Sequence, residues 1–436
     1  MRQRTVRQGS RTRQAAGGLA LVALLALLAV GAGSAAQPKV RVTLLVALTG
    51  QPAYSAVIEN FERAHPNITI ELAPAPATAA TYNQLLITEL AAGNAPELFA
   101  TYPGCGTLIS VCRLAKAGYL APMVRKPWAK SLDPRVLRYS KVGPTLYAYL
   151  PQVVFEGLLT NDTLLRKLGL KVPQTFSQLL AFCQRAKVTH TTPVMLTASG
   201  SNTLQQLVAD IALTTVYARD KHWPQKLKAG AVTFQGTAGW HQALQEIVDM
   251  NDAGCFQPGP AGTTGPAGDA IFAQGQTLTY AMVSSHKGLI DTSKPQFSYT
   301  QSPFPTAKND AKQTVAMLHF PNSLSVNAHA SAQGQAAAQT FVDFLARPDQ
   351  DALFARIGGG LSEAQLRQAR FPAWLSNFVP LYKQGRYAIN PIETWWNASA
   401  GNALSQYGTG LLTGQESVAH VLKKMDDAWK LGPDAD

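Results

Sequence analysis

The chain has 436 residues, of which 46% are hydrophobic and 15% are charged, so it can bury a large core and is not a disordered protein. Its formal net charge is +12, but the first 36 residues hold five Arg and no acid, and the remainder carries +7. Because Lys and Arg are scattered rather than clustered, the composition argues against a nucleic-acid-binding protein.

The first 36 residues have the three parts of a secretory signal peptide. A basic stretch, MRQRTVRQGSRTRQ, precedes an apolar core, Leu19 to Val30, that is too short for an ordinary transmembrane helix. Small residues at Ser34 and Ala36 predict cleavage after Ala36, with an uncleaved anchor as the alternative. No Cys follows the apolar core and no Arg pair precedes it, so we expect general secretion to the periplasm or another extracytoplasmic compartment, without a lipid anchor.

Strands and helices alternate in the next part of the chain. Apolar and β-branched runs predict strands at 39–48, 67–72 and 97–103, and helical spacing predicts helices at 52–66 and 78–94. Thr78 or Thr81 is expected to cap the second helix, and Gly-Asn-Ala-Pro at 93–96 to end it. This order predicts a parallel sheet with right-handed crossovers, whose carboxyl edge is where small ligands bind.

A second set of strands and helices follows. We expect an extended segment at 145–161, helices at 164–170, 175–187, 202–220 and 235–255, strands at 192–198, 276–285 and 320–328, and a helix at 331–358. Thr175 or Ser177 is expected to cap the helix at 175–187, and Gly254 to end the helix at 235–255. The Gly/Pro-rich stretch 258–268 is expected to be a loop, and the carboxyl-terminal third to be helical.

Four cysteines fit an oxidising compartment. Cys105 and Cys112 are seven positions apart and can close a small loop, which leaves Cys183 and Cys255 as the second pair. Free buried thiols are the alternative, and four cysteines allow three pairings, among which the sequence does not choose. A zinc site is disfavoured, because no two cysteines have the two-residue spacing of a zinc knuckle.

Five stretches carry motifs in a shared order: FERAHPNITIEL, ELAAGNAPELFA, LAKAGYLAPM, LYAYLPQVVFEGLLTNDTLLRKLGLKVPQTFSQLL and FAQGQTLTYAMVSS. Together they resemble the bacterial extracellular solute-binding proteins of ABC importers, in the group that binds maltodextrins, other sugars and glycerol-phosphodiesters. The resemblance extends over essentially the whole chain after residue 36. Glu97 replaces a usual Asp, Leu159-Thr160-Asn161 lacks the Tyr before Asn, Phe176 replaces a Trp, and no Pro follows Gly358 to Gly360, so ligand contacts near those glycines are in doubt.

The resemblance implies an α/β protein with the two-lobed periplasmic-binding-protein fold, a multi-strand hinge and a ligand cleft between the lobes. Carried over, the hinge crossings fall near Leu150–Gln152, Met282–Ser285 and Val326–Ala330. Lobe one is then expected at 37–152 plus 285–327, and lobe two at 153–284 plus 328–436.

Candidate ligand residues follow the strands and crossings at the cleft. A sugar needs short polar groups for its hydroxyls and flat apolar faces for its C–H surfaces, and both kinds of side chain occur there. The candidates are Gln51, Tyr54, Tyr102, Cys105, Gly106, Phe155, Glu156, Trp240, Ser284, Ser285, His286, Trp395 and Trp396. The alternatives are a surface turn for Gln51, core positions for Tyr54, Trp240 and one of the adjacent tryptophans, a structural disulfide loop at 104–106, an edge acid at Glu156 and an exposed His286.

Catalytic motifs are not found. The sequence contains no Gly-x-Ser-x-Gly, His-Glu-x-x-His or phosphate-binding Gly-Lys-Thr, and its eight His are scattered, so we expect no catalytic residue, metal or cofactor. The resemblance implies a monomer that captures a carbohydrate and passes it to the permease subunits of an ABC importer. The alternatives are a secreted glycoside hydrolase, a chemoreceptor partner, or a binding protein for a glycerol-phosphodiester, polyamine or peptide.

Overall fold

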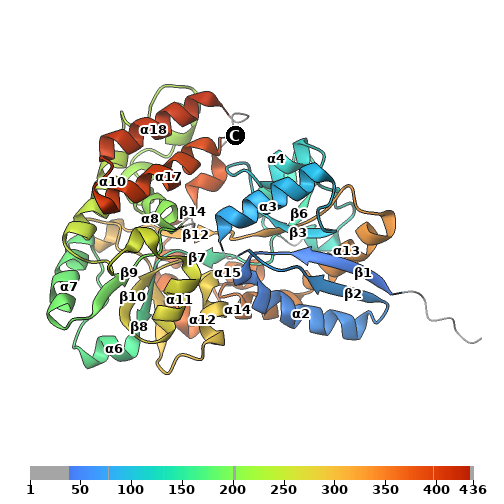
Figure 1. Ribbon diagram of the computed structural model, residues 1–436, viewed down its shortest axis with the longest axis horizontal. Coiled ribbons are helices and arrows are strands. Elements are labelled where there is room, and N and C mark those ends of the chain that lie inside the picture. Colours follow the sequence, from blue (N-terminus) through green and yellow to red (C-terminus); the bar gives the residue numbers. More distant parts are fainter. Residues whose placement is uncertain (1–38, 77, 131, 200–202, 396, 433–436) are drawn as a thin grey trace, which may run out of the picture. The chain divides into compact units, whose positions relative to one another are not determined.

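The computed structural model describes residues 39–76, 78–130, 132–199, 203–395 and 397–432, and the expected signal peptide lies outside these ranges. The chain from Val40 onward forms one compact unit (Figure 1). Within the described ranges, no helix has both the length and the apolar composition that a membrane crossing requires.

The first sheet contains the three strands predicted from the amino-terminal alternation and two more. Its five strands, in spatial order, are β2 (Ile68–Leu72), β1 (Val40–Leu45), β3 (Leu98–Thr101), β13 (Ser323–Val326) and β6 (Ala148–Tyr149). Strands β2, β1 and β3 are parallel, as predicted, and are connected by α2 (Gln51–Ala64) and α3 (Ala79–Ala92). Strand β13 is antiparallel to both β3 and β6.

Local signals define the ends of α3. The Thr78 side chain accepts a hydrogen bond from the Thr81 backbone N–H, and the Thr81 side chain accepts one from Thr78 in return, so both threonines take part in the cap. Gly93 follows the helix with φ of 75°, a left-handed conformation that glycine adopts without strain. The Tyr82 hydroxyl of α3 donates to the backbone oxygens of Leu45 and Ala100, and so ties the carboxyl ends of β1 and β3 together.

The remaining strands form three smaller sheets. In spatial order they are β11 (Tyr299–Ser302), β8 (Leu158–Asn161), β10 (Thr277–Ala281) and β9 (Thr192–Met195) in the second sheet, β14 (Tyr387–Ile389), β12 (Ala316–His319) and β7 (Val154–Phe155) in the third, and β4 (Lys141–Val142) with β5 (Thr145–Leu146) in the last. The third sheet is reached directly from the first, because residues 150–153 connect β6 to β7 and residues 320–322 connect β12 to β13.

Helices cover these sheets. The other helices are α4 (Val111–Lys116), α5 (Pro134–Leu137), α6 (Asp162–Lys167), α7 (Phe176–Val188), α8 (Thr203–Ala212), α9 (Trp223–Lys228), α10 (Ala238–Asp252), α11 (Gly265–Ala273), α12 (Lys287–Thr292), α13 (Ala332–Leu345), α14 (Pro348–Ile357), α15 (Glu363–Arg367), α16 (Val379–Lys383), α17 (Ser399–Thr413) and α18 (Val418–Leu431). Helices α17 and α18, red in Figure 1, pack on α10. The end of the chain therefore adds a further layer of helices over α10.

The structure corrects several predicted elements. The extended segment 145–161 is divided into four short strands. The helix expected at 202–220 is α8 followed directly by a π-helix, Leu213–Tyr217. The predicted helix at 331–358 is two helices, because Pro348 has no backbone N–H to donate and begins α14 instead. The stretch 258–268 is not a loop throughout, since α11 begins at Gly265 within it.

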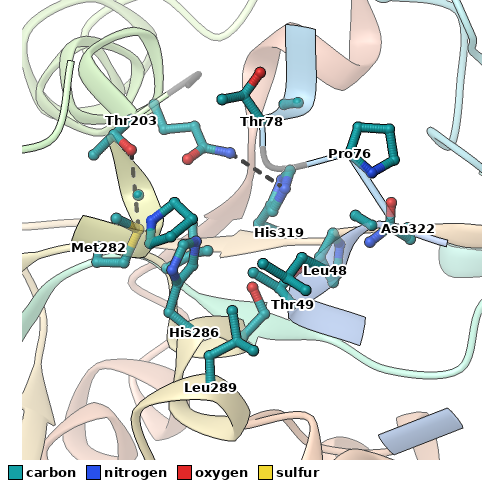
Figure 2. Close-up of a pocket in the computed structure, with 18 of the residues that line it drawn as sticks. Leu48, Thr49, Pro76, Thr78, Thr203, Met282, His286, Leu289, His319 and Asn322 are labelled. Atoms are coloured by element: carbon teal, nitrogen blue, oxygen red, sulfur yellow. Dashed lines mark hydrogen bonds between the residues drawn. The ribbon is translucent and has the colours of Figure 1, made fainter. Parts of the chain in front are cut away.

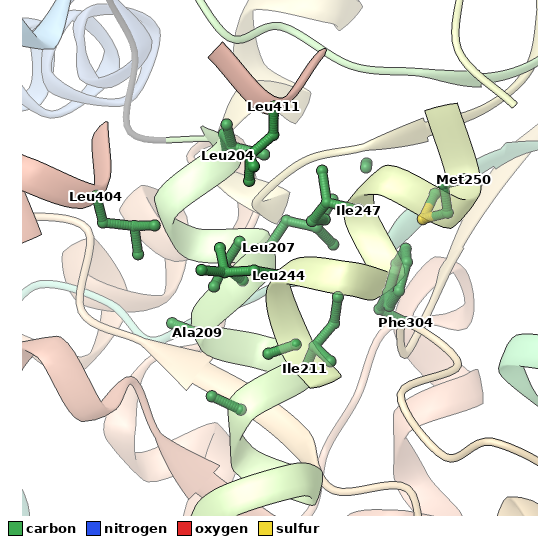
Figure 3. Close-up of a cluster of buried hydrophobic side chains, with 14 of the residues drawn as sticks. Leu204, Leu207, Ala209, Ile211, Leu244, Ile247, Met250, Phe304, Leu404 and Leu411 are labelled. Carbon is green, nitrogen blue, oxygen red and sulfur yellow. The ribbon is translucent and has the colours of Figure 1, made fainter. Parts of the chain in front are cut away.

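The described residues form two large hydrophobic cores. One joins the first sheet to α2, α3, α13 and α14, with Phe341 and Phe354 fully or almost fully buried in it. The other surrounds α8 and α10, where Leu207, Leu244 and Ile247 interdigitate (Figure 3). Helices α13 and α14 therefore pack with the first sheet, whereas the sequence-based division placed residues 328–436 in lobe two.

Both disulfides expected from the cysteine spacing are confirmed. Cys105 is bonded to Cys112, and Cys183 of α7 is bonded to Cys255, which follows α10. The described part of the chain holds no free cysteine.

Candidate ligand-binding site

A pocket of about 120 Å³ lies where chain segments leave three of the sheets. From the first sheet it takes Thr49, which follows β1, and Tyr102, which follows β3. From the second sheet it takes Met282 and Ser285, which follow β10, and from the third it takes His319, the last residue of β12. The carboxyl ends of strands thus converge on one cavity, as expected for a ligand site in an α/β protein.

The pocket wall combines apolar surface with uncharged polar groups. Figure 2 shows Met282 and His286 to one side of His319, and Pro76 and Asn322 to the other. The apolar part of the lining is Ala47, Leu48, Pro76, Ala79, Pro266, Met282, Val283, Leu289 and Pro321, and the polar part includes the hydroxyls of Thr49, Thr78, Tyr102, Thr203 and Ser285 and the amides of Gln206 and Asn322. No Lys, Arg, Asp or Glu belongs to the described lining.

His286 enters the pocket from a 3-10 turn, Ser284–His286, that follows β10. Its Nδ1 atom lies 2.9 Å from both carboxylate oxygens of Asp269, a residue of α11 that is 5% exposed. A Cβ atom at Gly265 would lie 3.3 Å from Cε1 of the ring, so the glycine at the start of α11 leaves room for the imidazole. Asp269 therefore contacts one ring nitrogen of His286, and Gly265 lies close to the adjacent ring carbon.

His319 is held in the same way by a different element. Its Nδ1 atom lies 2.6 Å from Oε1 of Glu393, and both side chains are almost fully buried. Burial raises the pKa of the Glu393 carboxyl, and the neighbouring His319 and the N–H of Phe320, which donates to Oε1, oppose that rise. On the other edge of the ring, Nε2 lies 3.5 Å from the side-chain nitrogen of Gln206, and Asn390 Nδ2 lies 3.4 Å from Nδ1.

Three of the sequence-predicted site residues line this pocket: Tyr102, Ser285 and His286. Burial raises the pKa of the Tyr102 hydroxyl to about 12, so this hydroxyl keeps its proton at neutral pH and can both donate and accept a hydrogen bond. The other ten candidates lie outside the lining or outside the described residues.

Residues near α2 and the disulfide loop lie beside the pocket. Gln51 begins α2 and its side chain donates to the backbone oxygen of Ala73, while Tyr54 is 2% exposed and packs edge-on against Phe354. Cys105 is in the disulfide. Gly106 lies against the backbone of Ile392, because a Cβ atom there would come within 1.8 Å of the Ile392 oxygen.

The candidates from the first and second crossings are buried. Phe155 packs between Phe371 and Phe378, and its backbone N–H donates to the Ser284 hydroxyl. Glu156 is fully buried, and neither of its carboxylate oxygens has a hydrogen-bond partner in the described part of the chain. These residues connect the sheets beneath the pocket rather than line it.

Two of the candidate tryptophans belong to the core around α8 and α10. Trp240 is completely buried and its ring centroid lies 6.0 Å from that of Trp395. The indole N–H of Trp395 donates to the Tyr217 hydroxyl at 3.1 Å. Trp396 lies outside the described residues.

Sequence reasoning missed much of the pocket, including His319, Gln206, Thr203, Thr78, Thr49 and Asn322. A signal for His319 was present in the sequence. The short apolar run AMLH ends in this histidine two residues before Pro321, much as the run ending ATYPG has Tyr102 directly before a proline. The polar residues of α8 carry no comparable signal, because Thr and Gln near a helix start are common on ordinary surfaces.

Comparisons with known proteins agree with this architecture. A solved sugar transporter of Bacillus licheniformis in complex with stachyose is 18% identical, with a TM-score of 0.70 over 89% of this chain and 98% of that one. The maltose-bound T. maritima MalE3 is 17% identical, with a TM-score of 0.72 over 90% of this chain and all of that one. At this identity the likeness shows the fold, which is the two-lobed fold expected from the sequence.

A curated relative adds a local match. The multiple sugar-binding protein of Streptococcus mutans serotype c (strain ATCC 700610 / UA159) is 26% identical over 148 residues, which cover 34% of this chain and 34% of that protein. The match thus spans about a third of the relative's length. The family model of the bacterial extracellular solute-binding proteins matches residues 47–352, which are most of the chain and include the whole described pocket lining. The chain belongs to the bacterial extracellular solute-binding proteins.

Proposed function

We propose that this protein is the extracytoplasmic solute-binding component of an ABC importer, and that it captures a sugar or oligosaccharide in the described pocket without chemical change. The pocket carries this proposal, because its described lining holds hydroxyls, amides and imidazoles beside an apolar wall, and no Lys, Arg, Asp or Glu. The likeness to stachyose- and maltose-bound proteins, and the match to a sugar-binding relative, support the same ligand class.

The lining suits a carbohydrate better than the alternative solutes. Hydroxyls of a sugar need both donors and acceptors, which Tyr102, Ser285 and Asn322 supply, and its C–H faces need apolar surface such as Met282 and Leu289. A glycerol-phosphodiester calls for a basic group, and a polyamine calls for carboxylates. The carboxylates nearest the pocket, Asp269 and Glu393, are each already engaged by a histidine.

The proposal includes two lobes that close on the ligand. We assign the first sheet with α2, α3, α13 and α14 to lobe one, and the core around α8, α10, α17 and α18 to lobe two. Residues 150–153 and 320–322 then belong to the hinge. We further propose that residues 1–36 direct secretion and are removed, and that the mature monomer delivers its ligand to membrane permease subunits.

Titration calorimetry and thermal unfolding of the secreted protein test the ligand class. The panel holds stachyose, raffinose, maltose, maltodextrins and monosaccharides, with glycerophosphocholine, spermidine and a tripeptide as the competing classes. A ligand that binds only the folded state stabilises it by about 2.7 kcal/mol at a hundred times its Kd, so one sugar is expected to raise the melting temperature clearly.

A Tyr102→Leu variant provides the control, since it keeps an apolar side chain in the wall but loses the ring and the hydroxyl of the tyrosine. We expect weaker sugar binding in this variant and unchanged binding in Tyr147→Leu, a tyrosine outside the lining. Binding of spermidine or the tripeptide with no sugar response would overturn the carbohydrate assignment. Products released from a bound sugar would overturn binding without chemistry.

A further inference from the structure

Two histidines in the pocket share an arrangement that selects the ligand. We propose that His286 and His319 each present an unprotonated Nε2 atom to the ligand, because a buried carboxylate, Asp269 or Glu393, holds the proton on Nδ1. The inference rests on the proposed sugar-binding function and names the chemistry of that selection. The ligand is an uncharged compound whose hydroxyl groups donate to two imidazole acceptors.

The geometry at His286 leaves one ring nitrogen for the ligand. Both carboxylate oxygens of Asp269 lie 2.9 Å from Nδ1, and Asp269 is almost completely buried and does not line the pocket. An ionised carboxylate only accepts hydrogen bonds, so Nδ1 carries the proton in the neutral ring and Nε2 carries the lone pair. The His286 side chain is 16% exposed and lines the pocket, so this second nitrogen is the one available to a ligand.

The Nδ1 atom of His319 also contacts a buried carboxylate, that of Glu393. The contact between Nδ1 and Glu393 Oε1, at 2.6 Å, is the shorter of its two contacts on that side, so the carboxylate rather than Asn390 determines which nitrogen carries the proton. On the opposite edge, the Gln206 side-chain nitrogen lies 3.5 Å from Nε2, as an amide donor does when it faces an imidazole lone pair. Gln206 also lines the pocket, and its 3.5 Å contact is at the long limit of a hydrogen bond, so a ligand hydroxyl binds His319 by taking the place of this amide at Nε2.

Two imidazole acceptors without a neighbouring cation exclude anions. Among the described residues of the lining there is no Lys or Arg to balance a phosphate or a carboxylate. An anionic ligand would therefore place acceptor oxygens against acceptor nitrogens, whereas a sugar hydroxyl can donate to each of them.

Asp269 and Glu393 act through the histidines, so they are positioning residues. Substitution of Asp269 by Asn replaces an oxygen with an N–H group that can face Nδ1. That contact favours the other tautomer, in which Nε2 carries the proton and becomes a donor. The tautomer is thus a readout that a merely structural role of Asp269 would leave unchanged.

The first experiment needs no ligand. Long-range ¹H–¹⁵N correlation spectra of histidine-labelled protein at pH 7.5 distinguish a protonated ring nitrogen from an unprotonated one, and His286→Gln and His319→Gln assign the two rings by loss of signal. We expect unprotonated Nε2 in both, and a switched or mixed state of His286 in Asp269→Asn. Protonated Nε2 in both rings of the wild-type protein would overturn the inference.

The second experiment measures binding of stachyose and maltose by calorimetry. Gln places an amide oxygen near the position of Nε2, whereas Asn reaches only as far as Nδ1. We expect His286→Gln and His319→Gln to keep Kd within about threefold, and His286→Asn and His319→Asn to raise it about tenfold, close to the loss of one hydrogen bond. His420→Gln is the matched control, because His420 also contacts a carboxylate, Glu416, but on α18 outside the pocket.

The two experiments separate the two proposals. If neither sugar binds while Nε2 is unprotonated in both rings, the choice of sugar fails and the acceptor chemistry of the pocket stands. If a sugar binds and the Asn and Gln variants bind it equally well, the proposed function stands and the role of the histidines is overturned. Tight binding of glycerophosphocholine by the wild-type protein would also overturn the exclusion of anions.

Discussion

Two acidic side chains, Glu156 and Asp210, are fully buried, and no described residue gives their carboxylate oxygens a hydrogen bond. Burial raises the pKa of both groups well above the usual range, and the proximity of Asp210 raises that of Glu156 further. A charged carboxylate without a partner is costly in such surroundings, so burial favours the protonated form of both groups in the folded protein. Burial also raises the pKa of Glu246 and of Asp351 to about 7.

These acids make stability fall as pH rises. Their pKa values are higher in the folded state than in the unfolded chain, where carboxyls ionise near pH 4 to 4.5, so their contribution is complete below that pH and is lost as pH increases through 7 and beyond. We expect Glu156→Gln to raise the free energy of unfolding at pH 8 by at least about 1.4 kcal/mol, the equivalent of one pKa unit, and to change it little at pH 4.

Urea denaturation of the wild-type and Glu156→Gln proteins at pH 4, 6 and 8 measures this change. The exposed Glu59, whose side chain is 75% exposed, supplies the control substitution Glu59→Gln, which should keep the wild-type pH dependence. An equal pH slope for the Glu156→Gln and wild-type proteins would mean that Glu156 is already ionised in the native state.

At the scale of elements, the loop after β3 lies directly on the turn that holds Glu393. A Cβ atom on Gly104 would come within 2.3 Å of the Glu393 backbone oxygen, and one on Gly106 within 1.8 Å of that of Ile392. Only glycine allows this approach, and Gly104 also has a left-handed φ of 71°. The disulfide loop and the 3-10 turn Pro391–Thr394 therefore fix each other's position beside the pocket.

A methyl group at Gly106 should separate these two segments. We expect Gly106→Ala to destabilise the protein by about 1 to 3 kcal/mol, because backbone rather than a flexible side chain would have to move. The matched control is Gly262→Ala, since nothing lies within 4 Å of a Cβ atom at that position. Thermal unfolding of the two variants compares them, and equal melting temperatures would show that the turn yields without cost.

The two disulfides differ in the length of chain they close. Cys105 and Cys112 are separated by 7 positions, and Cys183 and Cys255 by 72. Loop-closure entropy predicts a loss of about 2 kcal/mol when the first is removed and about 4 kcal/mol when the second is removed. Denaturation of the paired Cys→Ser variants tests this order, and a larger loss for the short loop would point to packing beside the pocket rather than chain entropy.

Local patterns predicted the elements that are long or strongly apolar. Strands β1, β2, β3 and β10 and the caps of α3 and α7 follow from apolar runs and from Thr78 and Thr175 alone. Strands β11, β12 and β14 were missed, because each is three or four residues long and is stabilised by pairing with distant chain. The break at Pro348 has a local signal, the proline itself, which begins α14.

Local patterns also predicted some residues of the pocket and not others. Tyr102, Ser285 and His286 could be predicted because they lie at or just after the ends of predicted strands, whereas His319 ends a strand, β12, that was not predicted. Trp240 and Trp395 were candidates for the site but lie in the core. A tryptophan that stacks on a ligand and one that fills a core cannot be distinguished in a sequence. The pairing of each histidine with a carboxylate distant in sequence depends on the fold and has no local signal.

At the scale of the whole molecule, the pocket is lined by residues that follow strands of the first sheet and of the second. A ligand that contacts both groups of residues connects the two sheets. Thr49 and Tyr102 belong to the side of the first sheet, and Met282 and Ser285 to that of the second. A ligand held by both sides favours the conformation in which they are close. We therefore expect saturating sugar to reduce the radius of gyration in small-angle X-ray scattering.

The Tyr102→Leu variant at the same sugar concentration should show a smaller fraction of contracted molecules, in proportion to its weaker binding. An unchanged radius of gyration in wild-type protein that calorimetry shows to be saturated would contradict closure. In that case the pocket would be preformed, and binding would be expected to occur without a slow conformational step.

The bond between Cys183 and Cys255 also has a consequence for when the chain folds. It encloses α7, β9, α8 and α10, the elements at the centre of the larger core. In a reducing cytoplasm this bond does not persist, so a newly made chain has a less stable native state there than in an oxidising compartment. For a chain secreted as proposed above, this difference makes folding before export less favourable, and oxidation after export makes the folded state harder to reverse.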